Sequence, residues 1–292
     1  MIFALHGRPF KEDNIPYVQH LLNHLQRKNI QLIINEAFVE YLIQCNITLP
    51  SSYLVFKTVY DLDTPNLMLS IGGDGTLLES ATFVGRKNIP LVGINTGRLG
   101  FLATTPREEI ESVIDELISG SYSISNRTLI KLLSEESLFG GLNFAMNEFA
   151  LTKRDSSSMI TVHTYIDGEF LNSYWADGLI VATPTGSTGY SLSCGGPLVH
   201  PKTENFIITP ISPHNLNVRP MIVPDSSIIS FEIEGRNQNF LISLDSRSEI
   251  VSSTIKLSLK KEDYQIQLVE LKNYNYYKTL RSKLNWGLDA RN

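Results

Sequence analysis

The chain of 292 residues has only two cysteines, Cys45 and Cys194. Two cysteines so far apart cannot build a disulfide framework or a tetrahedral thiolate site, a pattern typical of a reducing compartment. The sequence also lacks long apolar runs, and its start reaches a histidine and an arginine before any stretch of signal-peptide length forms. We therefore expect a cytoplasmic protein without a membrane partner.

Clusters of basic residues are missing as well. Lys and Arg number 25 and Asp and Glu number 30, so the formal net charge is −5, and the basic residues are scattered. This balance does not favour a nucleic-acid or anionic-membrane partner. A hydrophobic content of 42% and a charged content of 19% are those of an ordinary globular protein, long enough for two domains.

The first third of the chain alternates short apolar runs with segments of helical spacing. We expect strands at 1–6, 31–35, 66–71 and 90–95, and helices at 15–25, 36–45, 76–84 and 106–119. Alternation of this kind indicates a parallel sheet with helices on its faces, which is an α/β architecture.

After this region the apolar residues repeat with a period of two. We expect strands at 129–133, 144–152, 160–166, 169–174, 179–182, 206–209, 228–233, 240–244, 255–259 and 266–269. Small polar residues gather between 119 and 127, which favours a domain boundary there. The prediction is an α/β domain at 1–122, an all-β domain at 123–270, and a tail at 271–292 that packs back on the first domain.

The segment Gly72-Gly73-Asp74-Gly75-Thr76 follows an apolar strand and places one carboxylate among glycines. Glycines at a strand-to-helix turn let a phosphate approach the backbone, whereas a negative side chain repels it. The segment is neither a Rossmann fingerprint, because Leu78 replaces the third glycine, nor a Walker A loop. Asp74 is either a turn residue that caps the next helix or a group that acts on something other than a phosphate.

Two other segments carry polar groups in unusual places. The stretch 177–197 combines many hydroxyl side chains with glycines and prolines, which is typical of a nucleotide-binding loop, although a plain polar loop is the alternative. Asn147 and Glu148 interrupt an apolar strand, so they either face solvent or contact a ligand. His20 and His24 lie four residues apart without a third ligand, and we interpret them as a solvated helix face.

These segments together resemble the NAD kinase family, whose members phosphorylate the adenosine 2′-hydroxyl of NAD to give NADP. The similar segments are 72–76, 95–102, 147–148, 177–197, 212–214 with 219–220, and 279–288. The glycine-aspartate motif alone is shared with phosphofructokinases and diacylglycerol kinases, but the ordered set is far more specific. The resemblance implies a Rossmann-like parallel α/β domain, a β-sandwich-like all-β domain, and a homodimer or homotetramer.

The resemblance also implies roles for individual residues. Asp74 is the expected general base, ATP with Mg²⁺ the expected phosphoryl donor, and NAD the substrate; no protein ligand of the metal is assigned. Inorganic polyphosphate is the alternative donor. The residues implied to bind the nucleotides are Gly72, Gly73, Asp74, Gly75, Thr76, Asn147, Glu148, Ser158, Trp175, Asp177, Thr185, Thr188, Gly189, Tyr190, Ser191, Leu192, Ser193, His214 and Arg247.

The sequence departs from the family pattern at a few positions. Gly189 replaces an alanine, Trp175 stands where some relatives have a basic residue, and Ser246-Arg247 replaces a Gly-Gln or Ser-Gln pair. Two other functions remain open at this point. One is a sugar or diacylglycerol kinase that shares the glycine-aspartate motif, and the other is a non-catalytic protein that senses NAD(P).

Overall fold

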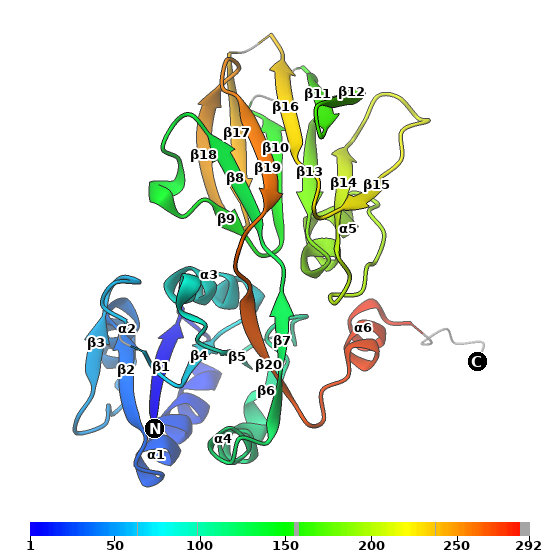
Figure 1. The fold of residues 1–292 in the computed structure, drawn as a ribbon. Coiled ribbons are helices and arrows are strands. Elements are labelled where there is room, and N and C mark those ends of the chain that lie inside the picture. Colours follow the sequence, from blue (N-terminus) through cyan, green and yellow to red (C-terminus); the bar gives the residue numbers. More distant parts are fainter. Residues whose placement is uncertain (63, 98, 155–157, 237, 287–292) are drawn as a thin grey trace. The chain divides into compact units, whose positions relative to one another are not determined.

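The computed structural model describes residues 1–62, 64–97, 99–154, 158–236 and 238–286. The chain folds into two compact units (Figure 1). Unit 1 contains residues 1–126 and the chain from 266 onward, and unit 2 contains residues 127–265. None of the described helices is long and apolar enough to cross a membrane.

Unit 1 is an α/β unit built on one sheet. Its strands are β1 (Ile2–Gly7), β2 (Gln31–Asn35), β3 (Leu54–Phe56), β4 (Leu67–Ile71), β5 (Leu91–Asn95), β6 (Thr105–Pro106), β7 (Tyr122–Arg127) and β20 (Ile266–Leu271). Its α-helices are α1 (Ile15–Arg27), α2 (Glu36–Gln44), α3 (Asp74–Val84), α4 (Ile110–Ile118) and α6 (Tyr276–Leu284). The strand order is β3-β2-β1-β4-β5-β20-β7, with β6 also paired to β5, and β1 to β5 pair in parallel.

Local sequence explains why these elements form. In α1 a proline occupies the first turn, where its missing N–H costs nothing, and Val18, Leu21, Leu22 and Leu25 repeat along one buried face. The side chain of Asn35 accepts a hydrogen bond from the Phe38 N–H at 3.3 Å and so caps α2. These helices and α4 pack on the central strands to form the core of unit 1.

Unit 2 contains two antiparallel sheets and little helix. One sheet has the order β15-β14-β13-β10-β17-β18 and the other has the order β12-β11-β16-β19-β8-β9. The first comprises β10 (Glu148–Lys153), β13 (Gly178–Ala182), β14 (Asn205–Ile211), β15 (Met221–Pro224), β17 (Asn239–Leu244) and β18 (Arg247–Ser252). The second comprises β8 (Ile130–Ser134), β9 (Phe144–Ala145), β11 (Ile160–Ile166), β12 (Glu169–Ala176), β16 (Ile229–Glu234) and β19 (Leu257–Lys261).

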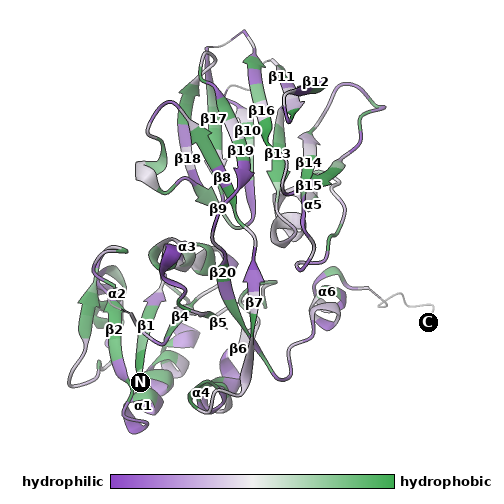
Figure 2. Ribbon diagram, in the orientation of Figure 1, coloured by the Kyte–Doolittle hydropathy of each residue, from purple (hydrophilic) through white to green (hydrophobic). Residues whose placement is uncertain are grey.

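Side chains from both sheets of unit 2 form one apolar core, as in a sandwich. Phe149 of β10 stacks on Phe231 of β16, with ring centroids 5.7 Å apart and the rings inclined by 13°. Apolar residues gather on central strands such as β2 and β13 (Figure 2). The predicted combination of a parallel α/β fold and an all-β fold is therefore confirmed.

Three differences from the predicted elements concern the site. The expected strand 144–152 is broken into β9 and β10, which belong to different sheets, because the chain crosses between the sheets at 146–147. The strand at 266–271, placed by its periodicity with the all-β series, pairs in parallel with β5 of unit 1. The predicted boundary segment holds β7, whose polar alternation resembles a linker. Residues 98, 287 and 288 of the family-like segments lie outside the described residues.

Candidate functional site

The glycine turn of unit 1 joins β4 to α3. A Cβ atom at Gly72 would lie 2.2 Å from Oγ1 of Thr76, so only glycine fits there. A Cβ atom at Gly73 or Gly75 would meet nothing within 4 Å, so the backbone at these two positions is open to a ligand. The helix begins at Asp74, and its first N–H groups and dipole favour an anion at this end.

Asp74 is held by a second segment of unit 1. Its Oδ2 atom accepts a hydrogen bond from the Phe101 N–H at 2.8 Å, and its Oδ1 atom accepts from Leu102 at 3.0 Å and Ala103 at 2.9 Å. A carboxylate offers about four acceptor positions, two on each oxygen. Oδ1 is filled by these contacts, so Oδ2 is the oxygen with room for a hydroxyl group. The carboxylate does not cap its own helix.

The C-terminal helix α6 contacts the same segment. The ammonium group of Lys283 donates to the Leu99 carbonyl and lies 5.8 Å from the centre of the Phe101 ring. Phe101 in turn donates its N–H to Asp74. Lys283 therefore holds the segment that holds Asp74.

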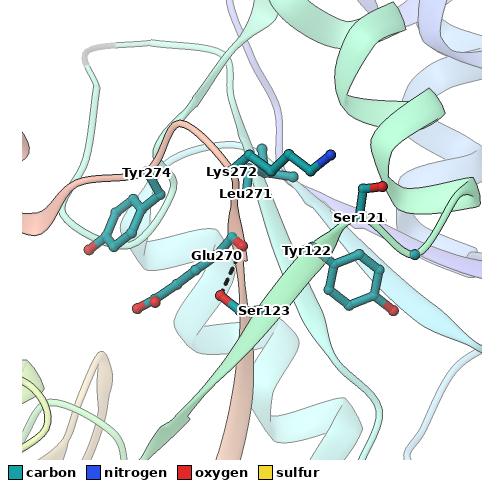
Figure 3. Close-up of a pocket in the computed structure, with 8 residues that line it drawn as sticks. Ser121, Tyr122, Ser123, Glu270, Leu271, Lys272 and Tyr274 are labelled. Atoms are coloured by element: carbon teal, nitrogen blue, oxygen red, sulfur yellow. Dashed lines mark hydrogen bonds between the residues drawn. The ribbon is translucent and has the colours of Figure 1, made fainter.

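Among the described residues of unit 1, three cavities bear on the site. One of about 820 Å³ has Phe10, Gly73, Asn95 and Arg107 among its lining residues, so it reaches the glycine turn. A second, of about 510 Å³, lies between α4 and α6. The third, of about 340 Å³, is shown in Figure 3, where Ser123 Oγ donates to the Glu270 carbonyl at 3.4 Å. Only the first contains a residue that the sequence predicted, Gly73.

In unit 2, Asn147 and Glu148 lie against the start of the glycine-rich loop. Thr183 donates its N–H to the Asn147 carbonyl at 2.8 Å and its hydroxyl to the Met146 carbonyl at 2.6 Å. A Cβ atom at Gly186 would lie only 2.0 Å from the Asn147 carbonyl oxygen. The structure therefore brings together two segments that were separate in the sequence.

Glu148 is half-buried, with its Oε2 atom shielded from solvent, and lies in an unusual electrostatic setting. Burial, and then the nearby charge of Asp245, raise its pKa to about 8, although a hydrogen bond from the Tyr190 N–H opposes this shift. Among the described residues, neither Oε2 of Glu148 nor Oδ1 of Asn147 has a hydrogen-bond partner. Two buried polar atoms without partners are typical of a site that a ligand completes.

The glycine-rich loop is less open than its sequence indicates. It contains two short helical turns at Thr185–Thr188 and Tyr190–Ser193. Thr188 donates its hydroxyl to the Thr185 carbonyl at 3.3 Å. The Ser191 hydroxyl lies 2.8 Å from the Thr209 hydroxyl and is fully buried, so it serves packing. Tyr190 and Ser193 are exposed, while Gly189 and Leu192 are half-buried.

The remaining predicted residues of unit 2 fall into two groups. The rings of Trp175 and His214 lie 4.2 Å apart, and the His214 N–H donates to the Trp175 carbonyl at 2.9 Å, so these two residues form one exposed aromatic surface. Asp177 is paired with Lys153 at 2.6 Å. Ser158 is half-buried.

Arg247 differs from this group, because its guanidinium donates to the carbonyls of Leu142 and Phe144. Its donors are directed at the backbone of unit 2. This placement favours a supporting role over direct contact with a nucleotide.

Sequence reasoning missed Asp245, Phe101 and Lys283. Asp245 follows the apolar strand β17, which is the same signal that singled out Asp74. The backbone donors of the segment around Phe101 leave no trace in side-chain types. In the described part of the chain no group of three His, Cys, Asp or Glu side chains could hold a metal ion. These residues therefore offer no protein cage for Mg²⁺.

Comparisons with known proteins agree with this arrangement. Residues 4–122 match the ATP-NAD kinase N-terminal domain and residues 146–270 match the ATP-NAD kinase C-terminal domain. The chain is 85% identical to the NAD kinase of Cytophaga hutchinsonii over 292 residues, and 45% identical to that of Flavobacterium psychrophilum over 295 residues. Both matches cover 100% of each chain.

Two solved structures share the fold. A yeast NADH kinase complexed with NADH matches with a TM-score of 0.89 at 24% identity, covering 99% of this chain and 88% of the other. An NAD kinase from Archaeoglobus fulgidus in complex with ATP matches with a TM-score of 0.76 at 25% identity, covering 98% and 99%. The chain belongs to the ATP-NAD kinase family.

Proposed function

We propose that the protein transfers the terminal phosphoryl group of ATP to the 2′-hydroxyl of the adenosine ribose of NAD, with Asp74 as the general base. The observation that carries this proposal is the carboxylate of Asp74, fixed by three backbone N–H groups beside two unobstructed glycines. Phosphoryl transfer requires a protein mainly to position groups and to stabilise charge, while a base accepts the hydroxyl proton.

The 2′-oxygen forms a bond to the γ-phosphorus of ATP, the bond from that phosphorus to the bridging oxygen of ADP breaks, and the hydroxyl proton passes to Asp74. Oδ2 of Asp74 takes the proton, because it accepts one backbone hydrogen bond where Oδ1 accepts two. The products are NADP, ADP and a proton that the carboxyl later releases to water.

The proposal assigns the phosphates to the glycine turn. The N–H groups around Gly72 to Thr76 and the N-terminus of α3 stabilise their negative charge. Mg²⁺ bound to ATP would neutralise part of the charge on the phosphates. The described residues supply no carboxylate cage for the metal, so no step depends on a protein ligand.

The proposal assigns NAD to the residues of unit 2. Oδ1 of Asn147 and Oε2 of Glu148 have no hydrogen-bond partner in the described part of the chain and can accept hydrogen bonds from ribose hydroxyls. The exposed pair Trp175 and His214 offers ring faces for an aromatic base. Further contacts are assigned to Ser158, Asp177, Thr185, Thr188, Gly189, Tyr190, Leu192 and Ser193, whereas Ser191 packs against Thr209 and Arg247 supports the backbone.

We also propose that the protein is cytoplasmic and forms a homodimer or homotetramer. Its two cysteines are free thiols, which suits a reducing compartment. The edge strand β15 exposes Met221 and Ile222, an apolar strip that a second copy of the chain can cover.

The activity is tested by incubating the purified protein with ATP, Mg²⁺ and either NAD, NADH or nicotinamide mononucleotide, and measuring NADP by coupled enzymatic reduction. Replacing ATP by polyphosphate in a parallel reaction identifies the donor. NADP that forms only with both donor and NAD supports the proposal. A phosphorylated sugar or diacylglycerol as the only product would refute it, and binding of NAD without turnover would identify a sensor.

A further inference from the structure

The turn between β17 and β18 forms hydrogen bonds with the backbone at Asn147 and Glu148. Asp245 lies in this turn, half-buried, and its carboxylate accepts hydrogen bonds from three successive N–H groups. The distances are 2.9 Å to Met146, 2.7 Å to Asn147 and 3.2 Å to Glu148. In return the Asp245 N–H donates to the Glu148 carbonyl at 3.0 Å.

Arg247 forms hydrogen bonds with the N-terminal part of the same segment. Its guanidinium donates to the carbonyls of Leu142 and Phe144 and lies 5.5 Å from the centre of the Phe144 ring. The Asp245 carboxylate thus accepts hydrogen bonds from N–H groups, and the Arg247 guanidinium donates to carbonyl groups, of the same stretch of chain. The turn fixes residues 142–148 around the crossing from β9 to β10, where residues 146–147 belong to neither strand.

The backbone at this crossing sets the positions of the Asn147 and Glu148 side chains. Among the described residues, Oδ1 of Asn147 and Oε2 of Glu148 are buried atoms without a hydrogen-bond partner. The Asn147 carbonyl is tightly packed against Gly186, so a small backbone shift would also displace the glycine-rich loop. A change at Asp245 is therefore transmitted to both.

We propose that Asp245 is a positioning residue that holds Asn147 and Glu148 for NAD, with Arg247 fixing the chain ahead of them. The inference rests on the proposed function, in which Asn147 and Glu148 hold NAD. Asp245 acts through the backbone, because all three of its acceptor contacts are to N–H groups of the protein.

The arrangement has an electrostatic consequence that packing alone does not have. The groups that face Glu148 are the Asp245 carboxylate, the Tyr190 N–H and the Tyr190 phenol. The charge of Asp245 contributes to the raised pKa of Glu148, so Asp245→Asn lowers the pKa of Glu148. If the ionised carboxylate accepts a ribose hydroxyl, NAD affinity rises as Glu148 loses its proton, and in the variant this rise moves to lower pH.

The test is calorimetric titration of Asp245→Asn with NAD, and separately with ATP, between pH 6.5 and pH 9. At pH 9, where Glu148 is ionised in both proteins, we expect NAD affinity to fall about tenfold, because an amide NH₂ replaces one of the accepting oxygens. ATP affinity stays unchanged, and the midpoint of the pH dependence moves to lower pH.

Asp225→Asn is the matched control. Asp225 is an aspartate of unit 2 that is buried at least as deeply, and it pairs with Lys261 at 2.7 Å. It should lose stability and keep NAD affinity within about twofold. If Asp245→Asn behaves like Asp225→Asn in affinity and pH midpoint, the inference is overturned. Loss of NAD binding by the unsubstituted protein would instead refute the proposed function.

A second variant covers the case in which Asp245→Asn does not fold. Arg247→Lys keeps the charge but loses the paired donation to Leu142 and Phe144. The folded variant should bind NAD several-fold more weakly and bind ATP normally. Unchanged NAD affinity in this variant would also overturn the inference.

Discussion

Asp74 and Gly100 are packed so closely that a Cβ atom at Gly100 would lie 1.8 Å from Oδ1 of Asp74 and 2.5 Å from its Cγ. The carboxylate therefore occupies the space of a missing side chain. Glycine at this position lets the segment from Phe101 to Ala103 close over the carboxylate and donate its N–H groups.

Gly100→Ala should reduce kcat/KM for NADP formation about 100-fold, because a displacement of the base by about 1 Å is enough for such a loss. Gly97→Ala is the matched control in the same segment, since its added Cβ would come no nearer than 4.0 Å to Oδ1 of Asn95. Steady-state rates of the two variants, with melting temperatures to establish folding, decide the matter. Equal activity in both would show that the close packing on Asp74 is unimportant.

Lys283→Gln removes the donation to the Leu99 carbonyl and the cation near Phe101. We expect kcat to fall by up to about tenfold, because the segment that orients Asp74 loses one charge-assisted hydrogen bond. Lys278 lies on the same helix and donates its backbone N–H to the Asn275 side chain, so Lys278→Gln is the control. The idea fails if the two variants have the same kcat.

Glu148→Gln should weaken NAD binding increasingly as the pH rises. The neutral amide resembles the protonated carboxyl, so the two proteins differ little at pH 6.5, below the Glu148 pKa of about 8, and differ about tenfold at pH 9. Calorimetry with NAD at both pH values measures the gap, and ATP affinity serves as the control. A gap that is independent of pH would contradict the role of the ionised carboxylate.

The same substitution changes stability in the opposite sense. A carboxyl whose pKa is higher in the folded than in the unfolded protein contributes stability below its ordinary value of 4.5 and loses it as the pH rises to about 8. Glu148→Gln should therefore raise the melting temperature relative to the unsubstituted protein at pH 8 but not at pH 4.5. Each kcal/mol gained in the free energy of unfolding raises the melting temperature by about 2–4 °C.

His6 predicts a loss of stability in acid. Burial lowers its pKa from 6.5 to about 4, so the unfolded chain binds a proton that the folded protein refuses between these values. This difference lowers the free energy of unfolding by about 2 kcal/mol at pH 5, and the loss vanishes above pH 6.5. Urea unfolding at pH 7 and pH 5 should show a smaller acid loss for His6→Gln than for the unsubstituted protein. The same loss in both would remove His6 from this account.

Much of the fold could be predicted because its signals are local. The strands at 31–35 and 160–166 begin and end where periodicity placed them, since a buried strand needs only a short run of suitable residues. The strands β7 and β18 could not be predicted. Both lie at the edge of a sheet and are largely exposed, so they carry polar residues and lack a clear apolar pattern. The break after Ala145 depends on Asp245. The residues that donate to its carboxylate, 146–148, precede it by 97 to 99 positions, so no local pattern indicates the contact.

The candidate site divides in the same way. Asp74 could be found because it is a lone carboxylate among glycines after an apolar strand, and Asn147 and Glu148 because polar side chains in an apolar strand are costly unless they are used. The donors that hold Asp74 are backbone groups 27 to 29 residues later, and a backbone N–H has no signature in the sequence. Arg247 was grouped with the ligand contacts by resemblance, whereas its carbonyl partners depend on the three-dimensional fold.

The most direct test of the account is Asp74→Asn, with turnover and NAD binding measured on the same preparation. An amide cannot accept the hydroxyl proton, so kcat should fall about 10²- to 10⁴-fold while the Kd for NAD stays within about threefold. An unchanged melting temperature confirms that the segment from Phe101 to Ala103 still closes over the side chain. Turnover near that of the unsubstituted protein would contradict the assignment of Asp74 as the base.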